Sequence, residues 1–146
     1  MATERTVEVE WIGAFLDGEG KIVSSTSGQL PELEVTWEGR TNEDAGLTSP
    51  EELLAAAHAS CFAMALSAGL ARAGTPPKRL EVSSKVTFDK VGDNWTVVSS
   101  DLDVKGQVPG ADAEKFKAAA EGARDNCPVS RAFKGNVKLS VSARLD

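Results

Sequence analysis

The chain has 146 residues, of which 41% are hydrophobic, and this is enough for one globular domain with a sizeable core. Its net charge is −6 at pH 7 and its pI is about 4.9, and its lysines and arginines are scattered along the sequence. A nucleic-acid-binding protein normally carries a clustered basic patch. We therefore expect no nucleic-acid partner.

The location of the protein is indicated by its apolar segments and its cysteines. The N-terminal residues lack the apolar core of a secretory signal. The longest apolar window, residues 53–71, is rich in alanine and contains His58 and Ser60, so we interpret it as a core helix and not as a membrane span. We expect a cytoplasmic protein with no membrane association. In a reducing compartment a disulfide between its two cysteines would be reversible.

The first forty residues alternate between apolar and polar side chains, which is typical of strands. The alternating segments are residues 7–11, 21–24 and 33–37. Segments rich in turn-forming residues separate them, at 17–20 and 27–31. This pattern predicts an antiparallel three-stranded meander.

A polar loop is expected at residues 38–48, followed by a long helix. Ser49 is a candidate N-cap, Pro50 suits the first helical position, and Glu52 completes a capping box. The helix is apolar nearly all round until the Gly-Thr-Pro-Pro segment at 74–77 ends it. Because an all-round apolar helix must be enclosed by other elements, we expect it to be the central helix.

The second half predicts a hairpin, a second helix and a final strand. Residues 80–88 and 95–104 have the strand pattern, residues 112–126 are amphipathic with helical spacing, and residues 137–141 form a strand. The predicted order is βββ-α-ββ-α-β, an α+β fold with antiparallel sheets around a long central helix. No linker or repeat divides the chain, so we expect a single domain over residues 1–146.

The two cysteines occupy helical segments. Cys61 lies in the middle of the apolar helix, and Cys127 ends the second helix directly before Pro128. A residue before proline is pushed out of the helical region, so the helix must stop there. Oxidation of one thiol to a sulfenic acid, followed by condensation with the other, would give a reversible disulfide. A lone buried cysteine is more often structural, and the separation of the two along the chain neither supports nor excludes contact.

Two motifs carry a resemblance to a known family. The run at residues 50–62, Pro-Glu-Glu-Leu-Leu-Ala-Ala-Ala-His-Ala-Ser-Cys-Phe, and the later Asn-Cys-Pro-Val-Ser at 126–130 resemble the OsmC/Ohr family of osmotically inducible and organic hydroperoxide resistance proteins. His58 after three alanines is more similar to the OsmC branch. The resemblance covers nearly the whole chain and implies the OsmC-like fold, an intertwined homodimer with sites at the subunit interface, and a thiol-dependent peroxidase that acts on organic hydroperoxides and more weakly on hydrogen peroxide. It also implies a dithiol reductant, usually a lipoylated protein.

The same resemblance assigns candidate catalytic residues. Cys61 matches the peroxidatic cysteine, Cys127 the resolving cysteine and Glu51 the catalytic glutamate, while Arg40 is the candidate for the family's arginine, although residues 43–49 depart from the family's usual approach to the helix. A bidentate pair with Glu51 would hold the Arg40 guanidinium, which would stabilise the Cys61 thiolate. Glu51 precedes Cys61 by ten residues, about 15 Å along one helix at about 1.5 Å per residue. We therefore expect the carboxylate to reach the thiol of a second subunit.

Alternative interpretations remain open at this stage. Acidic residues in a first helical turn favour the helix dipole whatever else they do, and His58 is either a base or a packed residue. Arg124 and Arg131 flank Cys127 as tuning groups or as solvated charges. One histidine and two cysteines without ligand spacing predict no metal site, and we expect no cofactor. The alternative function is a non-enzymatic stress or small-molecule-binding protein of the same fold with inert cysteines.

Overall fold

The computed structural model of the chain describes residues 1–30 and 32–146. The chain divides into two compact units, Met1–Leu53 and Leu54–Asp146, called here the N-terminal and the C-terminal unit. The division falls inside one continuous helix. The prediction of a single domain remains a prediction.

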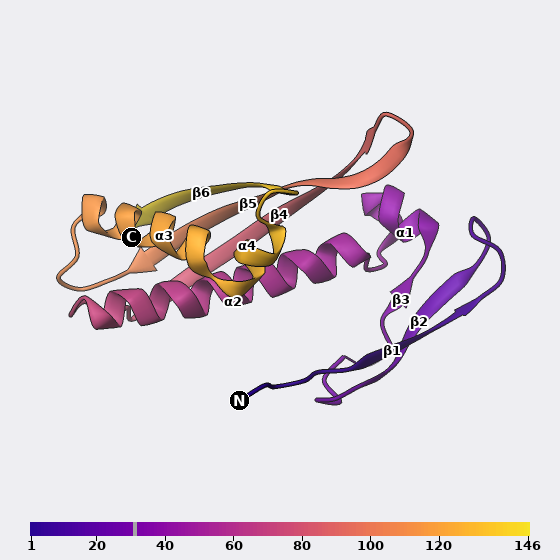
Figure 1. Cartoon of the computed structure of the whole chain (residues 1–146), viewed down its shortest axis with the longest axis horizontal. Coiled ribbons are helices and arrows are strands. Elements are labelled where there is room, and N and C mark those ends of the chain that lie inside the picture. Colours follow the sequence, from indigo (N-terminus) through magenta and orange to yellow (C-terminus); the bar gives the residue numbers. More distant parts are fainter. Residues whose placement is uncertain (31) are drawn as a thin grey trace. The chain divides into compact units, whose positions relative to one another are not determined.

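The N-terminal unit is a small antiparallel sheet followed by short helices. The strand order is β1-β2-β3, which confirms the predicted meander (Figure 1). The predicted turn at 27–31 lies partly outside the described residues, because Pro31 is not among them. The elements are β1 (Val7–Ile12), β2 (Glu19–Ser25), β3 (Glu34–Val35), α1 (Trp37–Thr41) and the 3₁₀-helix η1 (Glu43–Ala45).

The segment predicted as the end of a strand and a polar loop is partly helical, and this prediction was wrong. The third strand stops at Val35, and Thr36 caps α1 by accepting a hydrogen bond of 2.9 Å from the N–H of Gly39. A threonine in extended conformation with a side chain that satisfies an orphan N–H favours a helix start over a longer strand. The consequence is that Arg40 lies in the last turn of α1 and not in a loop.

The long helix α2 (Pro50–Arg72) begins where the capping residues predict. The Ser49 hydroxyl accepts a hydrogen bond of 3.1 Å from the N–H of Glu52, as the first half of a capping box requires. By length and composition alone this helix would also suffice to cross a membrane, a property that core helices of soluble proteins share.

The prediction that α2 is enclosed on all sides is wrong for the single chain. One face is buried and contains His58, Phe62, Leu66 and Leu70 at helical spacing. The opposite face is open, and Met64 is 68% exposed. The single chain therefore covers only one side of a helix that is apolar on both.

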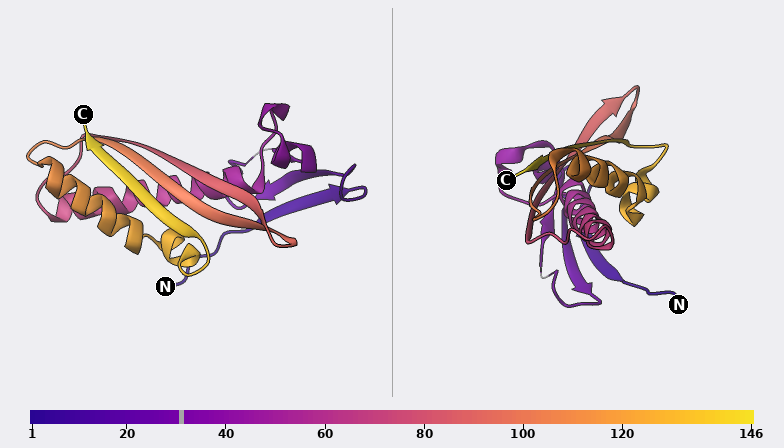
Figure 2. Two further views of the ribbon diagram at one scale, coloured as in Figure 1. Left: turned by 90° about the horizontal axis from the view of Figure 1, so that it is seen from above. Right: turned by 90° about the vertical axis from the view of Figure 1, so that its left-hand side faces the viewer.

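The C-terminal unit packs helices against one sheet. Figures 1 and 2 show β4 and β5 as a long twisted hairpin, with the helices on one side of the sheet. The hairpin confirms the prediction for this part of the chain. The elements after α2 are β4 (Arg79–Val91), β5 (Asn94–Gln107), α3 (Ala113–Asn126), α4 (Pro128–Phe133) and β6 (Lys138–Leu145).

The last strand differs from the predicted arrangement, because β6 is parallel to β5. The chain leaves the β4–β5 hairpin, crosses over through α3 and α4, and returns to the far side of β5, and such a helical crossover produces a parallel pair. The α+β class and the long helix are as predicted, whereas the expectation of wholly antiparallel sheets is wrong for this strand.

The core of the C-terminal unit lies between the sheet and the helices α2 and α3. Its fully buried side chains include Phe62, Leu66, Val104, Phe116 and Ala120. Alternate residues of β5 point into this core, as the period of a strand requires.

A close approach inside this core gives the first prediction. A Cβ at Gly106 would lie 2.6 Å from Cζ of buried Phe116, so Gly106→Ala should displace the ring and reduce the free energy of unfolding by about 1–3 kcal/mol. The measurement is urea denaturation. The control is Gly122→Ala in α3, where a Cβ meets open space and should not destabilise the protein. Equal stability of the two variants would contradict the prediction.

Candidate active site

The two thiols predicted as a redox pair come together in the C-terminal unit. Cys61 is half-buried in α2, and Cys127 is buried between α3 and α4. The Cys61 thiol lies beside the Cys127 side chain and the backbone of Val129, and both cysteines are in the free thiol form. The structure thus brings together two residues whose contact could not be judged from their separation in sequence.

Local backbone chemistry holds Cys127 in place. Cys127 has an extended conformation (φ −63°, ψ 143°), as expected for a residue before proline, and its N–H donates to the carbonyl of Ala123 at 2.9 Å. Pro128 then occupies the first turn of α4, and the Cys127 sulfur accepts a hydrogen bond from the N–H of Ser130 at 3.3 Å. The cysteine therefore ends one helix and caps the next.

The surroundings of Cys61 in the single chain do not favour its thiolate. Burial raises the pKa of the Cys61 thiol, and the neighbouring Cys127 raises it further, while the hydrogen bond with the Val129 backbone lowers it. Among the described residues, the groups that act on this pKa include no cation. An activating cation must therefore come from elsewhere if the thiol is to react quickly.

The predicted bidentate pair is present within the N-terminal unit. Nη2 of Arg40 donates to Oε1 of Glu51 at 2.6 Å, and Nε lies 3.1 Å from each carboxylate oxygen. The Glu51 residue is 7% exposed, so its charge is compensated by this guanidinium. The pairing confirms the geometric part of the prediction, whereas the catalytic role of the two residues remains a prediction.

His58 is packed in the core and makes polar contacts through both ring nitrogens. Nδ1 lies 2.6 Å from Oγ of Ser100, and Nε2 lies 2.8 Å from Oγ of Ser130. The ring of Phe133 packs edge-on against the imidazole, with centroids 5.2 Å apart. Burial lowers the pKa of His58, which favours the neutral imidazole.

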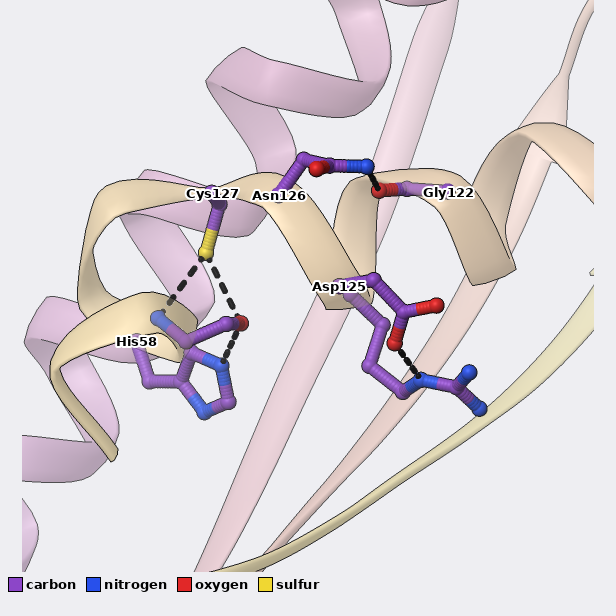
Figure 3. Close-up of polar contacts among 7 residues, drawn as sticks. His58, Gly122, Asp125, Asn126 and Cys127 are labelled. Atoms are coloured by element: carbon purple, nitrogen blue, oxygen red, sulfur yellow. Dashed lines mark hydrogen bonds and ion pairs between the residues drawn. The ribbon is translucent and has the colours of Figure 1, made fainter. Parts of the chain in front are cut away.

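The serine partners of His58 were missed in the sequence. Ser100 is fully buried in β5 and Ser130 is buried in α4. The Ser130 hydroxyl also lies 3.0 Å from Sγ of Cys127, which is labelled in Figure 3. The position of Ser130 could have been predicted, because the proline after Cys127 is typical of the start of a new helix, and residue 130 is then the third residue of that helix. The contact of Ser100 could not have been predicted, since a serine in a strand does not indicate a partner on a distant helix.

The two arginines that flank Cys127 in the sequence are Arg124 and Arg131. Nε of Arg124 donates to Oδ1 of Asp125 at 2.8 Å, an ion pair that is visible in Figure 3. Arg131 is exposed. Within residues 1–30 and 32–146, no group of three or more His, Cys, Asp or Glu side chains could hold a metal ion.

Comparison with known proteins identifies related sequences over most of the chain. The family described as OsmC-like protein matches residues 28–142. The chain is 35% identical over 144 residues to the peroxiredoxin OsmC of Escherichia coli (strain K12), with 99% of each chain covered. It is 33% identical over 126 residues to the organic hydroperoxide resistance protein OhrA of Bacillus subtilis (strain 168), covering 84% of this chain and 86% of that protein.

Solved structures with the same architecture support this relationship. The organic hydroperoxide resistance protein OhrB of Bacillus subtilis matches with a TM-score of 0.75 and 25% identity, covering 95% of this chain and 98% of that one. An organic hydroperoxide resistance protein of Elizabethkingia anophelis matches with a TM-score of 0.73 and 26% identity, covering 99% and 100% of the two chains. The names of these relatives support a peroxidase-type role.

The buried imidazole predicts a pH dependence of stability. The unfolded chain protonates its single histidine near the ordinary pKa of 6.5, whereas burial opposes this in the folded state. The unfolded state therefore binds more protons as the pH falls below about 6.5, and the free energy of unfolding decreases. Urea denaturation between pH 7.5 and 5.5 should show this loss. In His58→Gln the same pH interval should have a much smaller effect, and an unchanged slope would contradict the prediction.

Proposed function

Because this chain belongs to the OsmC-like protein family, we propose that it is a thiol-dependent peroxidase that reduces organic hydroperoxides, and hydrogen peroxide more weakly. The observation that carries the proposal is the contact between the Cys61 and Cys127 thiols. A pair of free thiols in contact can form a disulfide after oxidation of one of them. Inert structural cysteines would have no need of such a contact.

In the proposed reaction Cys61 is the nucleophile. Its thiolate attacks one oxygen of the O–O bond, a sulfur–oxygen bond forms, and the alkoxide leaves and is protonated to the alcohol. Cys61 is then a sulfenic acid. Cys127 attacks this sulfur, the disulfide forms and water leaves. A dithiol reductant, for which the family resemblance implies a lipoylated protein, returns two electrons and restores both thiols.

Arg40 and Glu51 are proposed to complete the site from a second subunit. Their own chain holds the guanidinium in a buried bidentate pair, and a fixed guanidinium can stabilise a thiolate and orient a peroxide oxygen. The Cys61 thiol of a single chain has a raised pKa, so it needs such a cation. Glu51 and Cys61 are about 15 Å apart along one helix, at about 1.5 Å per residue, so the two side chains of one chain cannot meet. A twofold axis that pairs two copies of α2 would bring Glu51 of one subunit to Cys61 of the other.

The exposed apolar surface supports a homodimer. The open face of α2 includes Met64, which is 68% exposed. In the N-terminal unit, large apolar side chains are also exposed, at Val9, Trp11, Ile12 and Phe15. Exposed large apolar side chains of this kind favour an interaction site, and a second copy of the chain with the same apolar helix face is its proposed occupant. A cytoplasmic location is proposed with this assignment, since the cycle requires a reducing compartment.

The proposal predicts a thiol-dependent turnover. With dihydrolipoamide as reductant, the wild-type protein should consume cumene hydroperoxide, and Cys61→Ser should reduce the rate to the uncatalysed level. In Cys127→Ser, one equivalent of peroxide should still oxidise Cys61, but continuous turnover with the dithiol should be lost because the disulfide cannot form. Peroxide consumption and thiol titration measure the two effects. Equal rates for wild type and Cys61→Ser would support the alternative of a non-enzymatic stress or binding protein with inert cysteines.

The shared site predicts a specific cross-link between subunits. A Glu51→Cys variant, made in a Cys127→Ser background, should link to Cys61 of a second copy and give a covalent dimer on a non-reducing gel with a short bismaleimide. Glu52→Cys in the same background is the matched control. The side chain at this neighbouring helical position points in another direction, so the yield of covalent dimer should be lower. If only intrachain products form, the site does not include a residue from the second subunit.

A further inference from the structure

A continuous chain of polar contacts leads away from Cys127. Starting at the sulfur, Sγ of Cys127 lies 3.0 Å from Oγ of Ser130, and this hydroxyl lies 2.8 Å from Nε2 of His58. On the other side of the ring, Nδ1 of His58 lies 2.6 Å from Oγ of Ser100, which in turn lies 3.0 Å from Oγ of Ser84. Figure 3 shows the part of the chain between Cys127 and His58. The four residues Ser130, His58, Ser100 and Ser84 are called here the hydroxyl–imidazole chain.

The hydroxyl–imidazole chain connects a buried thiol to a more accessible position. Cys127 is 1% exposed, and its three nearest members of the chain are also buried. The last member, Ser84 in β4, is half-buried and lies next to fully buried Ser100 through a cross-strand contact. A proton on the Cys127 sulfur therefore has a hydrogen-bonded route to a half-buried hydroxyl in β4.

Every member of the hydroxyl–imidazole chain is both a donor and an acceptor. A hydroxyl donates one hydrogen and accepts others, and a neutral imidazole donates from one nitrogen and accepts at the other. In one direction the Cys127 S–H donates to Ser130, Ser130 donates to Nε2 of His58, and Nδ1–H donates to Ser100. In the reverse direction the Ser130 hydroxyl donates to the sulfur. The first direction is the one expected when Cys127 is a thiol, and the reverse direction is the one expected when Cys127 is a thiolate.

We propose that the hydroxyl–imidazole chain is a proton relay that deprotonates Cys127 when it attacks oxidised Cys61. This inference rests on the proposed function, and it assigns Ser130, His58 and Ser100 as positioning and proton-transfer residues for the resolving step. It also gives a reason for a histidine inside an apolar helix face. The residue serves the resolving thiol through Ser130 and does not act on Cys61.

The proton balance of the step is simple. The Cys127 proton passes to Oγ of Ser130, the Ser130 proton to Nε2 of His58, the Nδ1 proton to Ser100, and onward through Ser84 to water. The Cys127 sulfur then forms the bond to the Cys61 sulfur, and the sulfur–oxygen bond of the sulfenic acid breaks. The departing hydroxide takes up a proton and leaves as water, so no net charge is created.

The relay requires His58 to exchange tautomers and not to hold a positive charge. Burial lowers the pKa of His58, so an imidazolium is disfavoured, but gain of a proton at Nε2 with loss of the proton at Nδ1 leaves the ring neutral. The edge-on contact with Phe133 keeps the ring in the orientation that serves both serines. A histidine with only one partner could not pass a proton on.

Charged groups near the relay are directed away from it. Cys61 is the titratable group that contacts Cys127 from α2. In α3, Arg124 is paired with Asp125, and in α4, Arg131 is exposed. In β5, Asp101 follows Ser100 and therefore points to the opposite face of the sheet, where it accepts hydrogen bonds from Ser99 and Ser140.

The test measures how long the Cys61 sulfenic acid survives. Protein oxidised with one equivalent of cumene hydroperoxide is quenched with dimedone at increasing times, and mass spectrometry gives the rate constants of sulfenic acid formation and of disulfide formation. In Ser130→Ala at pH 6.5, disulfide formation should slow by about 10²-fold relative to sulfenic acid formation. The deficit should shrink as the pH rises, since Cys127 then loses its proton directly to hydroxide.

A matched pair of variants in β5 separates the relay from packing. Ser100→Ala should slow disulfide formation in the same pH-dependent way, whereas Ser99→Ala, whose hydroxyl contacts Asp101 on the other face, should not. The proposal is overturned if Ser130→Ala and Ser100→Ala form the disulfide as fast as wild type, or if they are slowed equally at every pH. If wild type itself forms no sulfenic acid, the proposed function fails, and the relay fails with it.

Discussion

The regular geometry of α2 sets the spacing of three side chains on which the candidate site depends, Glu51, His58 and Cys61. With about 3.6 residues per turn, Glu51 lies in the first turn of this helix, His58 in the third and Cys61 in the fourth. The acid is held by Arg40, the histidine by two serines, and the thiol contacts Cys127. The same helix therefore presents a carboxylate, an imidazole and a thiol to three different sets of partners.

Buried polar groups explain why these contacts are well defined. A carboxylate, an imidazole and hydroxyls inside an apolar core each cost free energy unless their hydrogen bonds are made. Glu51 meets this requirement with a guanidinium, and His58 meets it with hydroxyls at both nitrogens. The core around His58 is otherwise mostly apolar, so the requirement of the imidazole selects one arrangement of helix and sheet among many that would bury similar apolar area.

The start of α2 and the place of Cys127 at a helix end were predictable because they follow from nearby residues. Ser49 and Pro50 mark the start of α2, and Pro128 forces Cys127 out of the helical region, whatever the rest of the chain does. One error was local, because Thr36 began a helix inside a predicted strand by capping the N–H of Gly39. The other depended on a distant partner, because the crossover through α3 and α4 returned the chain to the free edge of β5 and β6 joined it in parallel.

The sequence by itself determined which groups are available for chemistry: two thiols on helices, an acid at a helix start and an arginine before it. It also determined the family, through two motifs whose order along the chain matches. Only the tertiary structure decided that Cys61 touches Cys127, that Arg40 pairs with Glu51, and that His58 reaches Cys127 through Ser130. The physical reason is that helix caps and proline act over a few residues, whereas a side-chain contact depends on how whole elements pack to bury apolar surface.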